Sequence, residues 1–131
     1  MTDGPVREGR AMIAGMSPRL DPETWIFCTG GAPLTQAIAS FAEAEGLSQI
    51  LPLAFAEMAG YDTSLPMTRI VLEVHSALDG HGLTAAVSTT LAEAGIACNM
   101  VAAFHHDHVF VPFAEKDRAL AVLEALQSKA G

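Results

Sequence analysis

A short repeated segment is the feature that most limits how this 131-residue chain can fold. The segment Ile50–Glu57 resembles Phe110–Glu115, and the prolines within them, Pro52 and Pro112, are 60 residues apart. A repeat at a fixed spacing indicates one structural unit used twice. The sequence therefore predicts two related halves in a single small chain, over residues 1–62 and 63–131.

The first half is expected to be the shorter copy. Residues 24–29 (TWIFCT) are rich in β-branched and aromatic side chains, which predicts a strand that ends before two glycines. Helix propensity alone favours a helix over residues 37–47. The repeat instead favours a hairpin with strands 37–43 and 47–51, and a short helix over 54–60. A further short helix is expected over residues 8–17.

The second half has the clearer pattern. Alternation over residues 67–75 predicts a strand with one apolar face, and apolar residues at helical spacing predict an amphipathic helix that ends at Gly95. The expected elements are strand 67–75, helix 82–94, strand 96–104, strand 108–111 and helix 114–129. This order is most of a ferredoxin-like βαββαβ unit, an α+β fold with helices on one face of an antiparallel sheet. No final strand follows residue 129, so we expect an open sheet edge, and hence a homodimer.

Charge and composition exclude several classes of function. Acidic residues outnumber basic residues by 15 to 7, and a net charge of −8 argues against nucleic acid as a partner, because such a surface repels phosphate. Half of the residues are apolar, which excludes a disordered chain. No apolar run is long enough to span a membrane, and no secretion signal is visible. Cys28 and Cys98 are expected to be reduced thiols in a cytoplasmic protein.

The loop between strand 67–75 and helix 82–94 is the first candidate site. Its glycines allow the backbone to approach a ligand closely, and the following helix N-terminus suits a carboxylate. Asp79 or a backbone carbonyl can then hold an ammonium group. The alternative is a plain connection in which Ser76 or Asp79 caps the helix. Residues 80–85 also fit the G-x-G-x-x-A pattern of dinucleotide-binding folds, but the expected antiparallel sheet does not suit that fold.

A histidine cluster is the second candidate site. His105, His106, Asp107 and His108 all carry groups that bind transition metals. Adjacent side chains on a strand point to opposite faces, so at most two of the four are expected to converge. The alternative is a polar hairpin tip in which Asp107 fixes the turn. No motif for nucleophilic catalysis is present, and no catalytic residue is assigned.

Several segments resemble small bacterial ACT-domain proteins that carry two ACT-like modules in one short chain. These segments are Met16–Pro18, Trp25–Thr29, Glu45–Leu47, Val74–Ser76, Gly82–Val87, Leu91–Ile96 and His106–Pro112. The resemblance spans residues 12–128 and is strongest over residues 67–113. It implies ferredoxin-like modules that bind amino acids in regulatory roles, at interfaces between paired modules.

The resemblance also implies a ligand site in the second half. Carried onto this sequence, the ligand-binding residues are Ser76, Leu78, Asp79, Gly80, His81, Gly82, Leu83, Thr84, Asn99, Met100 and Val101. The leading interpretation is a non-enzymatic, amino-acid-binding regulatory protein that needs no cofactor. The alternatives are a metal-dependent enzyme that uses His106, Asp107 and His108, and an oligomerisation module that binds no small ligand.

Overall fold

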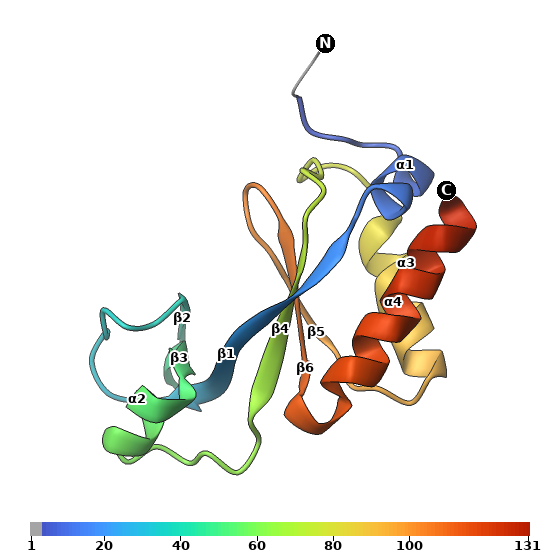
Figure 1. The fold of residues 1–131 in the computed structure, drawn as a ribbon. Coiled ribbons are helices and arrows are strands. Elements are labelled where there is room, and N and C mark those ends of the chain that lie inside the picture. The colour runs from blue at the N-terminus through green and yellow to red at the C-terminus, as the bar shows by residue number, and fades with distance from the viewer. Residues whose placement is uncertain (1–3) are drawn as a thin grey trace.

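The computed structural model describes residues 4–131, which form one six-stranded sheet with helices on one face (Figure 1). The strand order is β2-β3-β1-β4-β6-β5, and every neighbouring pair is antiparallel. The strands are β1 (Pro18–Thr29), β2 (Ala39–Glu43), β3 (Gly46–Pro52), β4 (Met67–Leu72), β5 (Asn99–Ala102) and β6 (Asp107–Pro112). The helices are α1 (Gly9–Ala14), α2 (Leu53–Met58), α3 (Leu83–Glu93), the 3-10 turn η1 (Phe113–Glu115) and α4 (Lys116–Ala130). The α+β, ferredoxin-like fold expected from the sequence is confirmed.

Strand β1 joins the two halves because it pairs with a strand of each. Its first part pairs with β4, from Pro18 opposite Leu72 to Trp25 opposite Met67. Its second part pairs with β3, from Trp25 opposite Pro52 to Thr29 opposite Ser48. The register shifts between residues 20 and 24, where Pro22 lies. Such an irregularity tolerates proline, which has no N–H to donate to the ladder.

No strand follows α4, as expected, but the expectation of an open sheet edge is wrong. The first part of β1 lies beside β4, antiparallel to it, where the last strand of a βαββαβ unit belongs. The unit is therefore completed by a strand that precedes it in the chain. The edge of β4 that was expected to be open is covered by β1, so it no longer supports the expectation of a homodimer. The first part of β1 was not predicted from the sequence, because Pro18 and Pro22 interrupt the alternation of side chains that marks a strand.

The repeat predicted the first hairpin correctly. Strands β2 and β3 form a hairpin in which Ala39 lies opposite Ile50. Strands β5 and β6 have the same register, with Asn99 opposite Phe110. Only residues 30–38 separate β1 from β2, whereas α3 lies between β4 and β5. The first half is thus a copy of the second without that helix.

The two prolines of the repeat occupy equivalent positions. Each ends a strand and precedes a helical turn, and their backbone angles are nearly identical, with φ −58° and ψ 140° at Pro52 and φ −55° and ψ 139° at Pro112. Proline fixes φ near these values, which suits the residue immediately before a helix. The repeated sequence therefore encodes the same strand-to-helix turn in both halves.

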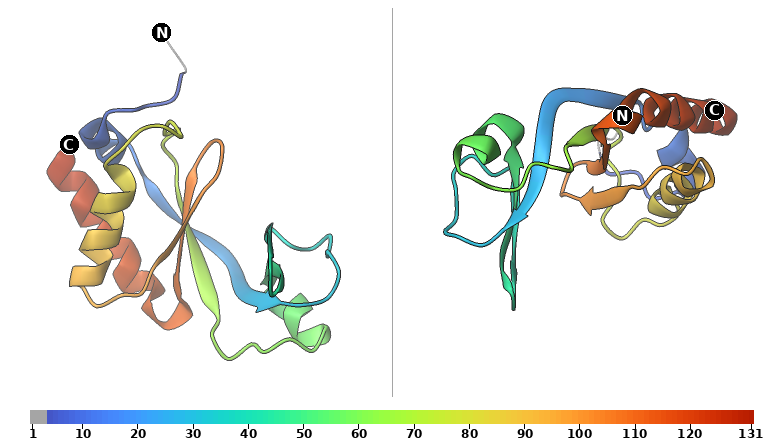
Figure 2. Two further views of the ribbon diagram at one scale, coloured as in Figure 1. Left: turned by 180° about the vertical axis from the view of Figure 1, so that it is seen from behind. Right: turned by 90° about the horizontal axis from the view of Figure 1, so that it is seen from below.

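Helices α1, α3 and α4 lie together on one face of the sheet, and α2 lies at its far end (Figures 1 and 2). Leu83, Val87 and Leu91 are buried on α3, as their spacing predicted, and pack against Ile70 and Leu72 of β4. Helix α2 covers a separate small core that contains Ile26, Leu51 and Ala56. The second view of Figure 2 shows how β1 curves between these two groups of helices.

Several elements are shorter than expected. Strand β4 ends at Leu72 rather than residue 75, because the next residue donates its N–H to Met16 O at 2.6 Å and the chain leaves the sheet. The strand expected over 96–104 is limited to β5, and the helix expected over 8–17 to α1. No helix within residues 4–131 has the length and apolar character to cross a membrane. The division of the chain at residue 62 stays a prediction, and the single sheet runs across it.

Candidate functional site

The loop between β4 and α3 is held in place by the N-terminal segment. Val6 N donates to His75 O at 2.7 Å, and Ala77 N donates to Val6 O at 2.8 Å. Gly80 approaches this segment so closely that an added Cβ would lie 3.2 Å from the Arg7 Cα. These contacts fix the loop against the residues that precede α1.

The loop forms one wall of a cavity of about 460 Å³, which is within the usual size range of small-ligand sites. Seven of the predicted ligand-binding residues line it: Ser76, Leu78, Gly80, His81, Gly82, Leu83 and Thr84. Five further residues complete the lining: Met12, Ala77, Ala85, Ala102 and Asp107. The sequence therefore located one wall of the cavity, and the structure adds the opposite wall.

The other four predicted ligand-binding residues lie elsewhere. Asp79 is exposed and forms an ion pair with Arg7, with 3.0 Å between its Oδ1 and the arginine Nε. Asn99 lines a separate cavity near Phe27, and Met100 packs against the core beneath α3 and α4. Val101 packs against a third apolar cluster, on the face of the sheet that the helices leave uncovered. Ala102 is the residue of β5 that reaches the cavity.

A buried carboxylate and a helix N-terminus meet in this cavity. Asp107 is buried, and its Oδ2 accepts a hydrogen bond from Ser76 Oγ at 3.2 Å. Helix α3 begins at Leu83 without a side-chain cap, after Gly82 with φ +110°. The first N–H groups of a helix have no partner within it and form its positive end. The cavity therefore presents a hydrogen-bond acceptor with negative charge and a group of donors.

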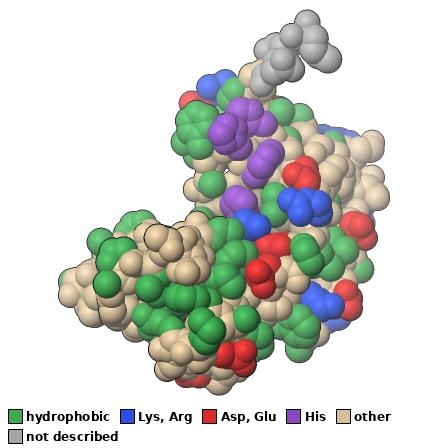
Figure 3. Space-filling view, turned by 60° about the vertical axis from the view of Figure 1, so that its left-hand side comes forward, with side chains coloured by type: hydrophobic (Ala, Val, Ile, Leu, Met, Phe, Trp, Pro, Cys, Tyr) green, Lys and Arg blue, Asp and Glu red, His purple; other side chains and the backbone are tan. Residues whose placement is uncertain are grey.

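The histidines do not form a metal centre. His106 Nδ1 lies 3.2 Å from Val74 O, and the rings of His75 and His105 are 5.4 Å apart between centroids. Figure 3 shows the histidine side chains along one face of the molecule. Within residues 4–131, no three His, Cys, Asp or Glu side chains are arranged to hold a metal ion. The geometry gives the metal-dependent alternative through His106, Asp107 and His108 no support.

Sequence reasoning gave Asp107 two alternative roles, as a metal ligand or as the residue that fixes a hairpin turn, and missed its place in the cavity. A signal was present, because Asp107 is the one acidic residue of β6, next to a run of apolar residues in the same strand. Its partner Ser76 comes from the loop after β4, and Leu72 lies opposite Asp107 in the sheet. The pairing of β4 with β6 therefore brings the carboxylate to the start of that loop.

Comparisons with known proteins agree with the fold. Two protein-family models match the chain, over residues 65–125 and 6–68, and both describe an ACT domain. A crystal structure of a Vibrio cholerae protein of unknown function, described as a possible transport protein, is 39% identical, with a TM-score of 0.78 over 87% of this chain and 92% of that chain. None of the curated proteins matches the chain.

A more distant structure shows the same fold. A crystal structure of a protein from Agrobacterium tumefaciens is 15% identical, with a TM-score of 0.62 over 95% of this chain and 91% of that chain. ACT domains are in general regulatory modules that bind ligands. The two domain matches and the similar Vibrio structure agree with the repeat and with the order of the strands. The chain therefore belongs to the ACT-domain family and carries two ACT-type segments in tandem.

Proposed function

We propose that this protein is a non-enzymatic regulatory module that binds an amino acid, or a similar zwitterion, in the cavity between loop 76–84 and Asp107. One observation carries the proposal: the buried Asp107 carboxylate and the uncapped N-terminus of α3 line the same cavity. A zwitterion has one group for each of them. Its carboxylate binds the first N–H groups of α3, and its ammonium group binds Asp107.

The charge of the protein supports a site of this kind rather than a general attraction for anions. The net charge of −8 repels a free carboxylate at long range. A carboxylate must therefore be held by local backbone donors, and a ligand that also carries a positive charge is favoured over a simple anion. Gly82 lets the backbone turn immediately before these donors.

Association and location complete the proposal. We expect a homodimer, because β2 and β5 lie at the edges of the sheet and each has one side free to pair with another strand. We expect the protein to work in the cytoplasm. Light scattering of the purified protein tests the homodimer directly, and a monomer at all concentrations would contradict it.

Isothermal titration calorimetry against the twenty amino acids tests the ligand. We expect at least one to bind with one site per chain, and Asp107→Asn to weaken it by roughly ten- to a hundredfold, since a hydrogen bond to a charged group is lost. Asp79→Asn is the matched control, because Asp79 is exposed and outside the cavity. Equal affinities for both variants would refute the site. No binding by any amino acid would favour the interaction module that takes no small ligand.

A further inference from the structure

The uncovered face of the sheet carries another cavity, which none of residues 76–84 lines. Phe27 and Phe41 are 44% and 75% exposed there. Large apolar side chains exposed together on one face of a protein often mark a binding site. Phe27 lies opposite Ile50 in the pairing of β1 with β3, and Ala39 lies opposite Ile50 in the pairing of β2 with β3. Side chains opposite one another in a sheet share a face, so Phe27, Ile50 and Ala39 form one apolar floor.

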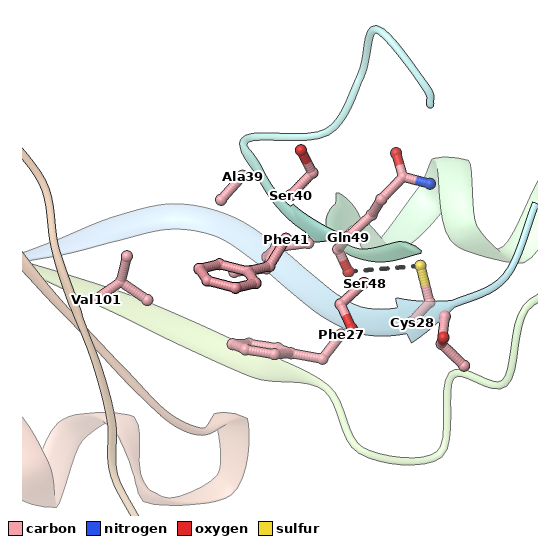
Figure 4. Close-up of a pocket in the computed structure, with 10 residues that line it drawn as sticks. Phe27, Cys28, Ala39, Ser40, Phe41, Ser48, Gln49 and Val101 are labelled. Atoms are coloured by element: carbon pink, nitrogen blue, oxygen red, sulfur yellow. Dashed lines mark hydrogen bonds between the residues drawn. The ribbon is translucent and has the colours of Figure 1, made fainter. Parts of the chain in front are cut away.

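The sheet curls so that its two ends approach each other over this floor. Ala39 of β2 and Val101 of β5, from the two edge strands, pack against the same cluster of Trp25 and Phe110. The rings of Phe27 and Phe41 both extend in the direction of Val101 (Figure 4). The resulting hollow has a volume of about 440 Å³. It is lined by Phe27, Cys28, Thr29, Ala39, Ser40, Phe41, Ser48, Gln49, Ile50 and Val101.

Among residues 4–131, no charged side chain lines this hollow. Its polar groups are hydroxyls, the Cys28 thiol and the Gln49 amide, and that amide is already bonded to Leu34 N at 2.9 Å and Ala32 O at 3.1 Å. A charged ligand group placed here would lose its water without gaining an opposite charge, which is costly. The hollow therefore selects for an uncharged, mainly apolar molecule.

A smaller cavity of about 100 Å³ adjoins the hollow, since Ala39 and Val101 line both. His108 and Arg69 line this smaller cavity. The Nδ1 atom of His108 is buried without a hydrogen-bond partner among residues 4–131. Burial lowers the pKa of His108, and the positive charges of Arg69 and His106 lower it further. A neutral imidazole can donate one hydrogen bond and accept another.

Arg69 does not call for an anionic ligand, because its charge is already balanced. Its Nη2 lies 2.9 Å from Asp21 Oδ2, and its guanidinium lies over the Trp25 ring at 5.5 Å from the centroid. The buried group in this region that lacks a partner, among residues 4–131, is the Nδ1 atom of His108. A buried polar atom without a partner is expensive, so a ligand that supplies one gains affinity.

We propose that the hollow between β2 and β5 binds a small, uncharged molecule with a flat apolar body and one hydrogen-bonding group. The body lies between the Phe27 and Phe41 rings and Val101, and the hydrogen-bonding group reaches His108. The volume lies within the range of small-ligand sites. Because both ends of the sheet wall the hollow, it fits a small molecule better than the surface of another protein.

Binding of the neutral dye N-phenyl-naphthylamine, which has an apolar body and one N–H group, tests the proposal. We expect saturable fluorescence enhancement with one site per chain. Phe41→Ala removes one ring, and Val101→Phe fills the space from the opposite wall. Each should raise the Kd of the dye by about tenfold. Phe104→Ala is the matched control, because Phe104 is 69% exposed but lies outside the hollow, and it should leave the Kd unchanged.

A pair of competitors tests the hydrogen-bonding group. Naphthol and methylnaphthalene differ by a hydroxyl in place of a methyl group. Naphthol should displace the dye at a lower concentration than methylnaphthalene, and His108→Leu should abolish this difference. Equal displacement by the two compounds in the unaltered protein would refute the role of His108.

Two outcomes would overturn the proposal as a whole. One is a dye affinity that is the same in Phe41→Ala, Val101→Phe and Phe104→Ala. The other is a dimer that dissociates in Phe41→Ala while dye binding is unaffected, which would make the hollow a contact between two copies of the chain. Neither outcome bears on amino-acid binding at Asp107, so the two proposals fail independently.

Discussion

Removing the Asp21 carboxylate is a direct test of how β1 holds the two halves together. Asp21 lies at the register shift of β1, and its Oδ2 accepts hydrogen bonds from Trp25 Nε1 at 2.9 Å and from Arg69 Nε at 3.0 Å. The side chains of Asp21 and Arg69 are only 9% and 19% exposed. Trp25 is also the residue at which β1 contacts both β3 and β4. The cluster therefore fixes the point that the two halves share.

The expected cost of Asp21→Ala follows from this burial. The substitution leaves a mostly buried guanidinium without its carboxylate and the Trp25 indole N–H without an acceptor. Breaking a buried ion pair by removing one partner costs about 3–5 kcal/mol. Arg69 keeps some exposure and its position over the Trp25 ring, so we expect the lower end, about 3 kcal/mol. That is a large share of the total stability of a small domain, which is about 5–15 kcal/mol.

Urea unfolding followed by circular dichroism measures this change, and the chain supplies a matched control. Arg19 and Glu73 also connect β1 to the end of β4, but their side chains are 53% and 40% exposed. Glu73→Ala should therefore lower the free energy of unfolding by less than about 1 kcal/mol. If the two substitutions cost the same, the reasoning from burial would be refuted. If Asp21→Ala cost less than Glu73→Ala, the cluster would not be what joins the halves.

Three further predictions concern single residues. Burial raises the pKa of Asp21, but its hydrogen bonds and the Arg69 charge outweigh this effect and lower the pKa below its usual value of 3.8. The natural protein should therefore be more stable than Asp21→Asn by its full margin above pH 3.8, and the margin should shrink as the pH falls through the lowered pKa of Asp21. Urea unfolding measured over a series of acidic pH values checks this. Burial raises the pKa of both Cys28 and Cys98, so iodoacetamide should modify them more slowly at neutral pH than it modifies free cysteine. Mass spectrometry measures the rates of modification, and rates equal to that of free cysteine would contradict the prediction. Gly82→Ala should destabilise the protein by about 2 kcal/mol and Gly95→Ala by about 1 kcal/mol. Both glycines have a positive φ, but only at Gly82 would the new Cβ approach another part of the backbone, 3.3 Å from Gly9 Cα. Equal melting temperatures of the two variants would contradict this prediction.

The local parts of the fold were predictable from the sequence, and the long-range pairing was not. The repeat around Pro52 and Pro112 correctly favoured a hairpin over 37–51, although helix propensity opposed it. The pairing of β1 with β4 joins residues 18–25 to residues 67–72, and no local pattern specifies it. Pro22 interrupted the alternation that would have marked β1 as one long strand.

The same limit explains which parts of the candidate site were foreseen. Loop 76–84 is continuous in sequence, and its glycines and helix start are local signals. Asp107 reaches the cavity through the register of β6 against β4, and Ala102, not Val101, is the residue of β5 that lines it. The hollow on the uncovered face depends on the curl of the sheet, which brings Val101 and Phe41 to the same cavity. Curl and register result from packing across the whole sheet, so sequence spacing did not predict them.

Amino-acid binding at loop 76–84 is the central claim, and an amide NMR titration tests it most directly. Amino acids are added to the isotope-labelled protein, and the shift of every backbone amide is followed. We expect the largest changes at Gly82, Leu83 and Thr84, where the N–H groups of α3 meet the ligand carboxylate, and at Asp107 opposite them. Unchanged spectra with all twenty amino acids, or changes confined to Phe27 and Phe41, would contradict the account.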